Sequence, residues 1–287
     1  GRDVLGIAQT GTGKTASFVL PMITLLGKGR ARARMPRSLV LAPTRELAAQ
    51  VAENFDTYSK YTKLTKALLI GGVSFGEQDK LIDRGVDVLI ATPGRLLDHH
   101  ERGKLLLTGV QIMVVDEADR MLDMGFRPAV DRVVAKCPKD RQTLFFSATL
   151  DGEAGRIALM YTHDAARHEH TPPAQKTADI EHRFVRVERD GRLDQLVGEI
   201  GTGYDLNLVF VRTKHGADKL CRMLCAAGHK AMAIHGNKSQ TARTQALAGF
   251  KSGDIRALVA TDIAARGIDI DELPHVVNYE IPNISED

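Results

Sequence analysis

The stretch Ala8-Gln9-Thr10-Gly11-Thr12-Gly13-Lys14-Thr15 decides the fold of the first half of this chain. It follows an apolar run at 4–8, typical of a buried strand, and it leads into a helical pattern at 16–26. The glycines free backbone N–H groups to face phosphate oxygens, and the helix start adds its positive dipole end. The pattern predicts a phosphate-binding loop in which Lys14 reaches the β- and γ-phosphates and Thr15 ligates Mg²⁺. A plain glycine-rich turn is the alternative, which the flanking strand and helix disfavour.

Composition indicates an intracellular enzyme and little more. The 287 residues are enough for two domains of ordinary size. Lys and Arg exceed Asp and Glu by 39 to 36, a balance that permits nucleic-acid contact without requiring it. The three cysteines, Cys137, Cys221 and Cys225, follow no metal or disulfide pattern, and no run is long enough to span a membrane. We therefore expect a cytoplasmic protein, and the lack of an initiator Met at Gly1 suggests a piece of a longer chain.

The first half of the chain alternates short apolar runs with helical segments. This rhythm predicts an α/β fold with a mainly parallel sheet flanked by helices, and the expected strands are 4–8, 38–42, 67–70, 86–91, 112–115 and 143–146. A polar cluster follows each run directly. Because ligands bind beyond the carboxyl ends of the strands in an open parallel sheet, we expect these clusters to share one edge.

The alternation of apolar runs and helical segments stops after residue 162 and continues further along the chain. The polar stretch 163–177, with Pro172-Pro173, predicts a linker between a first domain at 1–162 and a second at 178–287. His163, His168 and His170 invite a metal site, but a solvated linker explains them better. Expected strands of the second domain are 182–187, 208–211, 231–234, 257–260 and 275–281. Only the first domain carries a phosphate loop.

Asp116 and Glu117 are the predicted centre of the chemistry. They end an uninterrupted apolar strand, where two carboxylates are costly unless a cation lies beside them. We expect Asp116 to hold Mg²⁺, largely through water, and Glu117 to orient or deprotonate the water that attacks the γ-phosphate. Asp119 could accept hydrogen bonds from the hydroxyls of Ser147 or Thr149. Helix capping is the alternative role for an Asp-Glu pair.

Six motifs in order resemble those of the DEAD-box ATP-dependent RNA helicases, especially the bacterial members. They are Gly11-Thr12-Gly13-Lys14-Thr15, Pro43-Thr44-Arg45-Glu46-Leu47-Ala48, Thr92-Pro93-Gly94-Arg95, Asp116-Glu117-Ala118-Asp119, Ser147-Ala148-Thr149 and Ala264-Ala265-Arg266-Gly267-Ile268-Asp269. The resemblance implies two tandem RecA-like domains, the second incomplete here, in a monomeric enzyme. The implied enzyme hydrolyses ATP with Mg²⁺ and binds RNA.

The resemblance also assigns roles to matching positions. Catalysis would involve Lys14, Asp116 and Glu117. ATP would be bound by Thr10, Gly11, Thr12, Gly13, Lys14, Thr15 and Asp269, with Mg²⁺ at Thr15 and Asp116, and coupling would use Asp119, Ser147 and Thr149. RNA would be bound by Thr44, Arg45, Gly72, Thr92, Gly94, Arg95, Thr213, Gly236, Gln240, Arg243, Thr261 and Gly267. Gln240 and Arg243, one helical turn apart, could equally form a solvated helix face.

The implied mechanism is ATP-gated closure of two domains that opens a short RNA duplex locally. The family has an upstream Gln that reads adenine and a downstream Arg that contacts the γ-phosphate, and neither lies within this chain. We therefore expect this chain to bind nucleotide and hydrolyse it weakly. The alternatives are an ATP-gated RNA clamp without unwinding, a DNA translocase, or an inactive gene fragment.

Overall fold

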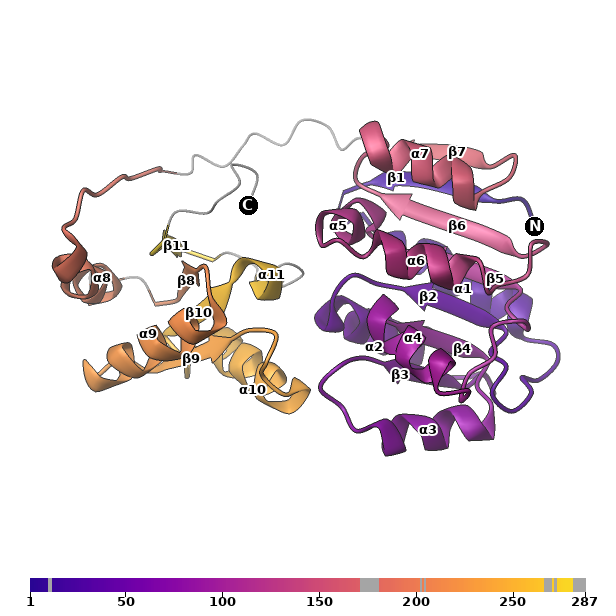
Figure 1. Cartoon of the computed structure of the whole chain (residues 1–287), viewed down its shortest axis with the longest axis horizontal. Coiled ribbons are helices and arrows are strands. Elements are labelled where there is room, and N and C mark those ends of the chain that lie inside the picture. The colour runs from indigo at the N-terminus through magenta and orange to yellow at the C-terminus, as the bar shows by residue number, and fades with distance from the viewer. Residues whose placement is uncertain are drawn as a thin grey trace. The chain divides into compact units, whose positions relative to one another are not determined.

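A computed structural model describes residues 1–9, 12–170, 181–201, 203, 205–265, 270 and 273–280. The chain divides into two compact units, Gly1–Lys176 and Thr177–Asp287. Each unit has its own sheet and its own apolar core, so each is described separately (Figure 1). No helix within the described ranges is long and apolar enough to cross a membrane.

The first unit is built on a parallel sheet of seven strands. They are β1 (Val4–Ala8), β2 (Ser38–Leu41), β3 (Lys66–Leu69), β4 (Val88–Ala91), β5 (Ile112–Val115), β6 (Gln142–Ser147) and β7 (Ala166–His170). Their order across the sheet is β3-β4-β2-β5-β6-β1-β7. β1 therefore lies between β6 and β7, with Val4 opposite both Leu144 and Ala166.

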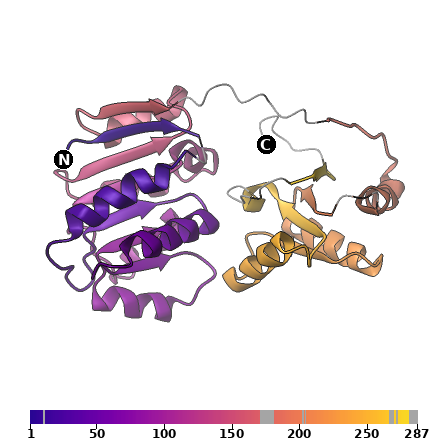
Figure 2. The same cartoon turned by 180° about the vertical axis from the view of Figure 1, so that it is seen from behind.

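Helices cover both faces of this sheet. They are α1 (Lys14–Leu26), α2 (Arg45–Ser59), α3 (Phe75–Arg84), α4 (Pro93–Glu101), α5 (Ala118–Asp123), α6 (Arg127–Val134) and α7 (Gly152–Tyr161). α1 and α2 pack on one face, seen in front in Figure 2, and α4 to α7 pack on the other, seen in front in Figure 1. Successive strand residues contribute to opposite layers, since Leu39 and Leu41 join one core and Val40 the other. This burial on both faces explains the continuous apolar runs.

The second unit repeats this architecture on a smaller scale. Its strands are β8 (Asn207–Val211), β9 (Ala231–Ile234), β10 (Ala257–Thr261) and β11 (His275–Asn278), and they form a parallel sheet in the order β11-β8-β10-β9. Its helices are η1 (Arg189–Gly191), α8 (Arg192–Gly201), α9 (Lys214–Ala226), α10 (Gln240–Lys251) and α11 (Asp262–Ala265). α8 and α9 share one core and α10 packs in another. Two parallel sheets flanked by helices confirm the predicted α/β class.

Two sequence expectations differ from the structure. The expected linker at 163–177 contains strand β7, which pairs along its whole length with β1. Its histidines, His168 and His170, are exposed on that strand, and the described residues hold no group of three or more His, Cys, Asp or Glu suited to a metal. The expected strand at 182–187 has no regular secondary structure, and Phe184 in it is 96% exposed. An alternating apolar pattern forms a strand only where a neighbouring strand pairs with it.

A buried ion pair ties the end of α1 to the start of β4. Arg37 Nη1 lies 3.1 Å from Asp87 Oδ1 and also donates to the carbonyl oxygen of Leu26 at 3.0 Å. Arg37 Nη2 donates to the carbonyl oxygen of Lys28 at 2.6 Å. Asp87 Oδ2 accepts from the backbone and hydroxyl of Thr65 at 3.1 and 3.2 Å. Both charged side chains are about nine-tenths buried, so the pair depends on these surrounding bonds.

Candidate functional site

The carboxyl ends of the parallel strands bring the predicted motifs of the first unit to one edge. β1 leads to the phosphate loop, β2 to Thr44, β4 to Thr92, β5 to Asp116, and β6 ends at Ser147. The six strands β1 to β6 run in one direction, so the segments that follow them leave the sheet on the same side. The expected common edge is therefore present.

The phosphate loop ends at Gly13, which precedes the first residue of α1. Gly13 has φ 85°, a left-handed conformation that favours glycine. Among the described residues, no further atom lies within 4 Å of the position that its Cβ would occupy. Thr12 Oγ1 donates to the carbonyl oxygen of Gln9 at 2.7 Å, which closes the loop. Lys14 and Thr15 begin the helix and are half-buried. Thr10 and Gly11 lie outside the described residues.

Asp116 is a buried carboxyl group at the end of β5. The residue is 2% exposed, and its Oδ1 has no hydrogen-bond partner within the described part of the chain. Burial raises the pKa of Asp116 to about 7, and the charge of Lys14 opposes that rise. A buried carboxylate oxygen without a donor is the kind of atom that a hard divalent cation such as Mg²⁺ binds. The chemistry of Asp116 therefore fits the predicted metal role.

Glu117 is held in an uncommon backbone conformation. Its φ is 50°, its side chain is buried, and Arg120 Nη1 donates to its Oε2 at 2.5 Å. Glu117 occupies the N-cap position of α5, yet its side chain makes no capping hydrogen bond. Side-chain capping therefore does not explain this residue. Backbone strain in a buried carboxylate is typical of functional positions.

Asp119 connects the β5 loop to the segment after β6, although not as predicted. Its Oδ2 accepts from the backbone N–H of Ala148 at 3.0 Å. The expected bonds to hydroxyls are wrong, because Ser147 Oγ is buried without a partner in the described structure and Thr149 Oγ1 accepts from Asp151 N at 3.2 Å. A carboxylate that accepts from a backbone N–H still links the two segments.

The predicted RNA-facing residues of the first unit lie at helix starts and turns. Thr44 caps α2 by accepting from Leu47 N at 3.2 Å, whereas Thr92 precedes α4 without such a bond. Gly72 has φ 80°, and Gly94 is exposed with open space around it. Arg45 approaches Gly71 so closely that a Cβ there would lie 3.0 Å from Arg45 Nη2. Arg95, in the first turn of α4, is half-buried.

In the second unit, the predicted residues follow β8, β9 and β10. Thr213 caps α9 by accepting from Gly216 N at 3.0 Å, and Gly236 is exposed in the turn after β9. Arg243 is 4% exposed, which rules out the alternative of a solvated helix face for it, and Gln240 Oε1 is also buried. Thr261, at the end of β10, is buried as well. Gly267 and Asp269 lie outside the described residues.

Two features near the site were not predicted. Arg120 pairs with Glu117, and the spacing of three residues on a helix start could have indicated that contact. Phe75 packs against Arg95 and against His99, and His99 contacts Gln78. No local pattern indicates this cluster, because its members come from α3 and α4.

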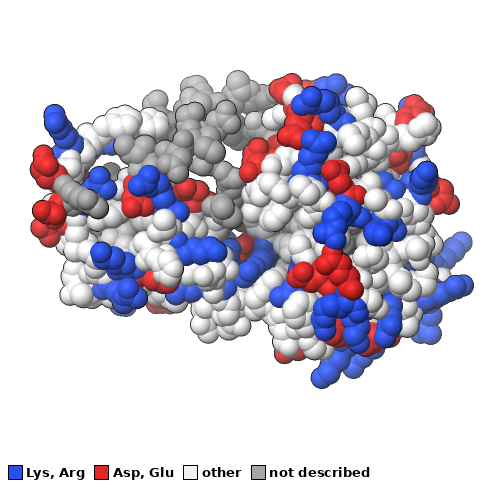
Figure 3. All heavy atoms as spheres, in the orientation of Figure 1, with Lys and Arg blue, Asp and Glu red and all other residues white. Residues whose placement is uncertain are grey.

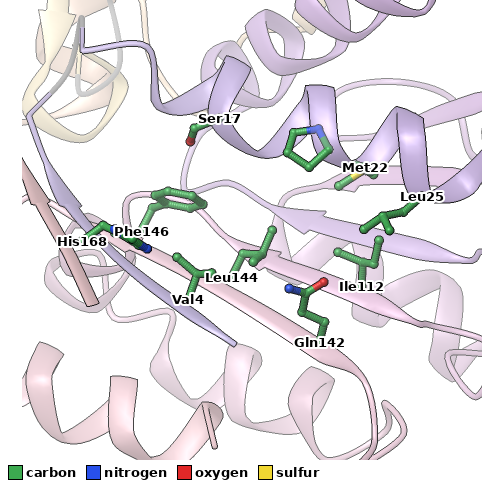
Figure 4. A pocket seen from close by; sticks show the side chains of 11 residues that line it. Val4, Ser17, Met22, Leu25, Ile112, Gln142, Leu144, Phe146 and His168 are labelled. Carbon is green, nitrogen blue, oxygen red and sulfur yellow. The ribbon is translucent and has the colours of Figure 1, made fainter. Parts of the chain in front are cut away.

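A cavity of about 340 Å³ lies elsewhere in the first unit, between α1 and the sheet (Figure 4). Val4, Met22, Leu144 and Phe146 line it, together with seven further residues. None of the residues predicted to bind nucleotide or RNA belongs to this lining. The cavity is therefore distinct from the candidate site.

Charged side chains on the face covered by α4 to α7 are mixed in sign. Figure 3 shows basic and acidic groups interspersed over this face, and the ion pairs of Arg132 with Glu101 and of Arg127 with Glu153 account for part of the pattern. A surface neutralised in this way attracts phosphates weakly.

The Asp116→Asn variant is expected to be more stable than the parent at about pH 8, with a smaller difference at about pH 5. Folding raises the pKa of Asp116 from its usual 3.8 to about 7, so the folded state favours the protonated form. That stabilising proton is lost as the pH rises through about 7, whereas Asn stays neutral. Thermal unfolding without nucleotide measures the effect, with the exposed Asp140→Asn as control. A difference that is independent of pH would contradict the expectation.

Comparisons with known proteins cover both units. The profile of the DEAD/DEAH box helicase family matches residues 1–157, and that of the helicase conserved C-terminal domain matches 188–287. The ATP-dependent RNA helicase DeaD of Mycobacterium tuberculosis is 40% identical over 288 residues, which cover 100% of this chain and 50% of that protein. The ATP-dependent RNA helicase DBP2 of Chaetomium thermophilum is 41% identical over 304 residues, 100% of this chain and 53% of that protein. The chain thus spans about half the length of the curated relatives it matches.

Comparison with solved structures also finds a DEAD box protein. A DEAD box protein from Methanococcus jannaschii is 37% identical with a TM-score of 0.55, and the match covers 98% of this chain and 75% of that one. S. cerevisiae Dbp5 bound to RNA and ADP BeF3 is 32% identical with a TM-score of 0.79, and the match covers 99% of this chain and 72% of that one.

Proposed function

The chain belongs to the DEAD/DEAH box helicase family, and from that premise we propose that it forms the core of an ATP-dependent RNA helicase. Its two units are then the RecA-like domains of that family. The proposed activity couples ATP binding and hydrolysis to local, sequence-independent opening of RNA duplexes. The observation that carries the proposal is the buried pair Asp116 and Glu117, which ends β5 at the same sheet edge as the phosphate loop.

Different residues of the first unit bind the phosphates, hold the metal ion and accept the proton during ATP hydrolysis. Lys14 and the N–H groups at the start of α1 bind the phosphates of ATP. Thr15 and Asp116 would hold Mg²⁺, which when bound neutralises charge on the β- and γ-phosphates. Glu117 accepts a proton from the water that attacks the γ-phosphate, and Arg120 holds its carboxylate in place.

RNA recognition at the same edge uses groups that bind phosphate and sugar. In the first unit these are the hydroxyls of Thr44 and Thr92, the exposed backbone at Gly72 and Gly94, and the guanidinium groups of Arg45 and Arg95. Such groups do not read base edges, so binding is independent of sequence. In the second unit we assign RNA contact to Thr213, Gly236, Gln240, Arg243, Thr261 and Gly267, and nucleotide contact to Asp269.

We also propose a cellular compartment and an oligomeric state for the protein. The cysteines Cys137, Cys221 and Cys225 are all free, which suits a reducing compartment, and we place the protein in the cytoplasm. We also propose that the chain acts as a monomer.

The test is ATP hydrolysis by this chain, with and without single-stranded RNA, together with strand separation of a short labelled RNA duplex. We expect RNA to stimulate turnover and ATP to be required for strand separation. Equal stimulation by DNA of the same length would favour a DNA translocase. ATP-dependent retention of RNA without strand separation would favour an RNA clamp.

A further inference from the structure

The orientation of the Arg95 guanidinium depends on the side chains around it. Its Nη1 is buried without a hydrogen-bond partner within the described residues, and desolvation lowers the pKa of the group. A half-buried Arg with an unsatisfied N–H has little to fix its orientation through hydrogen bonds. The contact that does fix it comes from another helix.

Phe75, the first residue of α3, provides that contact. The Cζ atom of Arg95 lies 4.0 Å from the centroid of the Phe75 ring, and the Cζ atom of Arg102 lies 4.3 Å from the same centroid. The two arginines are seven residues apart, which is about 10 Å along α4. Both guanidinium groups nevertheless lie within cation–π distance of the same ring.

The Phe75 ring is itself held by buried polar groups. His99 is fully buried and meets the ring edge-on, with centroids 5.1 Å apart and an interplanar angle of 64°. Its Nδ1 lies 3.0 Å from Asp79 Oδ1, and its Nε2 lies 2.7 Å from Gln78 Oε1. Gln78 Nε2 donates in turn to the carbonyl oxygen of Ile70 at 3.0 Å.

These contacts connect two segments of the candidate RNA edge. Ile70 directly follows β3 and precedes Gly71 and Gly72, whereas Arg95 belongs to the segment after β4. The chain of contacts runs from Ile70 through Gln78 and His99 to Phe75, and from there to Arg95. A displacement of Phe75 would therefore alter where the Arg95 guanidinium lies.

We propose that Phe75 is a positioning residue that holds the Arg95 guanidinium in the orientation in which it meets an RNA phosphate. This inference rests on the proposed function, because it takes Arg95 as an RNA contact. Phe75 itself does not touch RNA. The aromatic ring acts by restricting the freedom of Arg95 before RNA arrives, so that less entropy is lost on binding.

The test compares Phe75→Leu with Phe75→Tyr in the full chain. Leu keeps an apolar side chain but removes the aromatic face, and Tyr retains the face. We expect Phe75→Leu to raise the Kd for fluorescent single-stranded RNA, in the presence of a non-hydrolysable ATP analogue, by about 3- to 10-fold. Phe75→Tyr should restore the parent value to within about twofold. The exposed Phe184→Leu is the matched control and should leave the Kd unchanged.

A double-mutant cycle separates positioning from general packing. In an Arg95→Ala background, Phe75→Leu should cause no further loss of RNA affinity, because the ring then has no guanidinium to hold. In the Phe75→Leu single variant, the KM for ATP and the kcat at saturating RNA should remain those of the parent. Equal losses in both backgrounds, or a lowered kcat with unchanged RNA affinity, would overturn the role of Phe75. A parent chain that binds no RNA would instead contradict the proposed function itself.

Discussion

Replacement of Glu117 by Gln is expected to lower RNA-stimulated ATP hydrolysis by about 10²- to 10⁴-fold while leaving ATP binding intact. Gln has the shape of Glu and can still accept from Arg120, so the geometry of the 2.5 Å contact is conserved. It cannot take a proton from the attacking water. Steady-state turnover and the affinity of a fluorescent ATP analogue measure the two quantities separately.

The matched control for this variant is Glu153→Gln. Glu153 lies in the first turn of α7, is exposed and pairs with Arg127. The control variant therefore removes the same charge from a helix start on the face of the sheet opposite α1. Its turnover should stay within about twofold of the parent, because an exposed pair contributes little. Full turnover of Glu117→Gln would show that another group accepts the proton.

Replacement of Arg37 by Met is expected to lower the free energy of unfolding of the first unit by about 3 to 5 kcal/mol. The change leaves Asp87 buried without its cation and leaves the carbonyl oxygens of Leu26 and Lys28 without a donor. Met keeps most of the apolar volume of the Arg side chain. The decrease in the free energy of unfolding therefore measures the contribution of the polar network around Arg37. Urea unfolding of the full chain measures it.

Arg34→Met is the control for this experiment. Arg34 forms an ion pair with Asp83 at 3.0 Å, but both side chains are more than two-fifths exposed. Solvent screens such a pair, and the expected loss is at most about 1 kcal/mol. Similar losses in the two variants would mean that the burial of Arg37 and Asp87 has no energetic consequence.

The sequence predicts strands β1 to β6 because most of their residues are buried, on both faces of the sheet. A strand such as β5 is apolar at every position, and the polar residues that follow it mark the carboxyl end of the sheet. The shared edge then follows from the parallel direction alone. This reasoning predicts Asp116 and Glu117, whereas the phosphate loop is predicted from its own glycine pattern.

Features that depend on tertiary contact were not predictable. β7 has a polar sequence with exposed side chains, and only its backbone pairing with β1 makes it a strand. The run at 182–187 has a strand-like pattern, but no strand pairs with it within the described residues. Likewise, the stack of Phe75 on Arg95 joins residues of two helices whose local sequences contain no sign of each other.

The position of β1 between β6 and β7 also constrains how the protein folds during synthesis. Val4 pairs with Leu144 and Ala166, so the strand that precedes the phosphate loop waits for partners 140 and 162 residues further along the chain. Contacts of such long sequence separation form late. A nascent chain that ends before residue 170 contains the complete phosphate-loop sequence but lacks part of strand β7. We therefore expect that its phosphate loop is not yet supported by a stable sheet. Its capacity to retain nucleotide should appear only when the last edge strand has emerged from the exit tunnel.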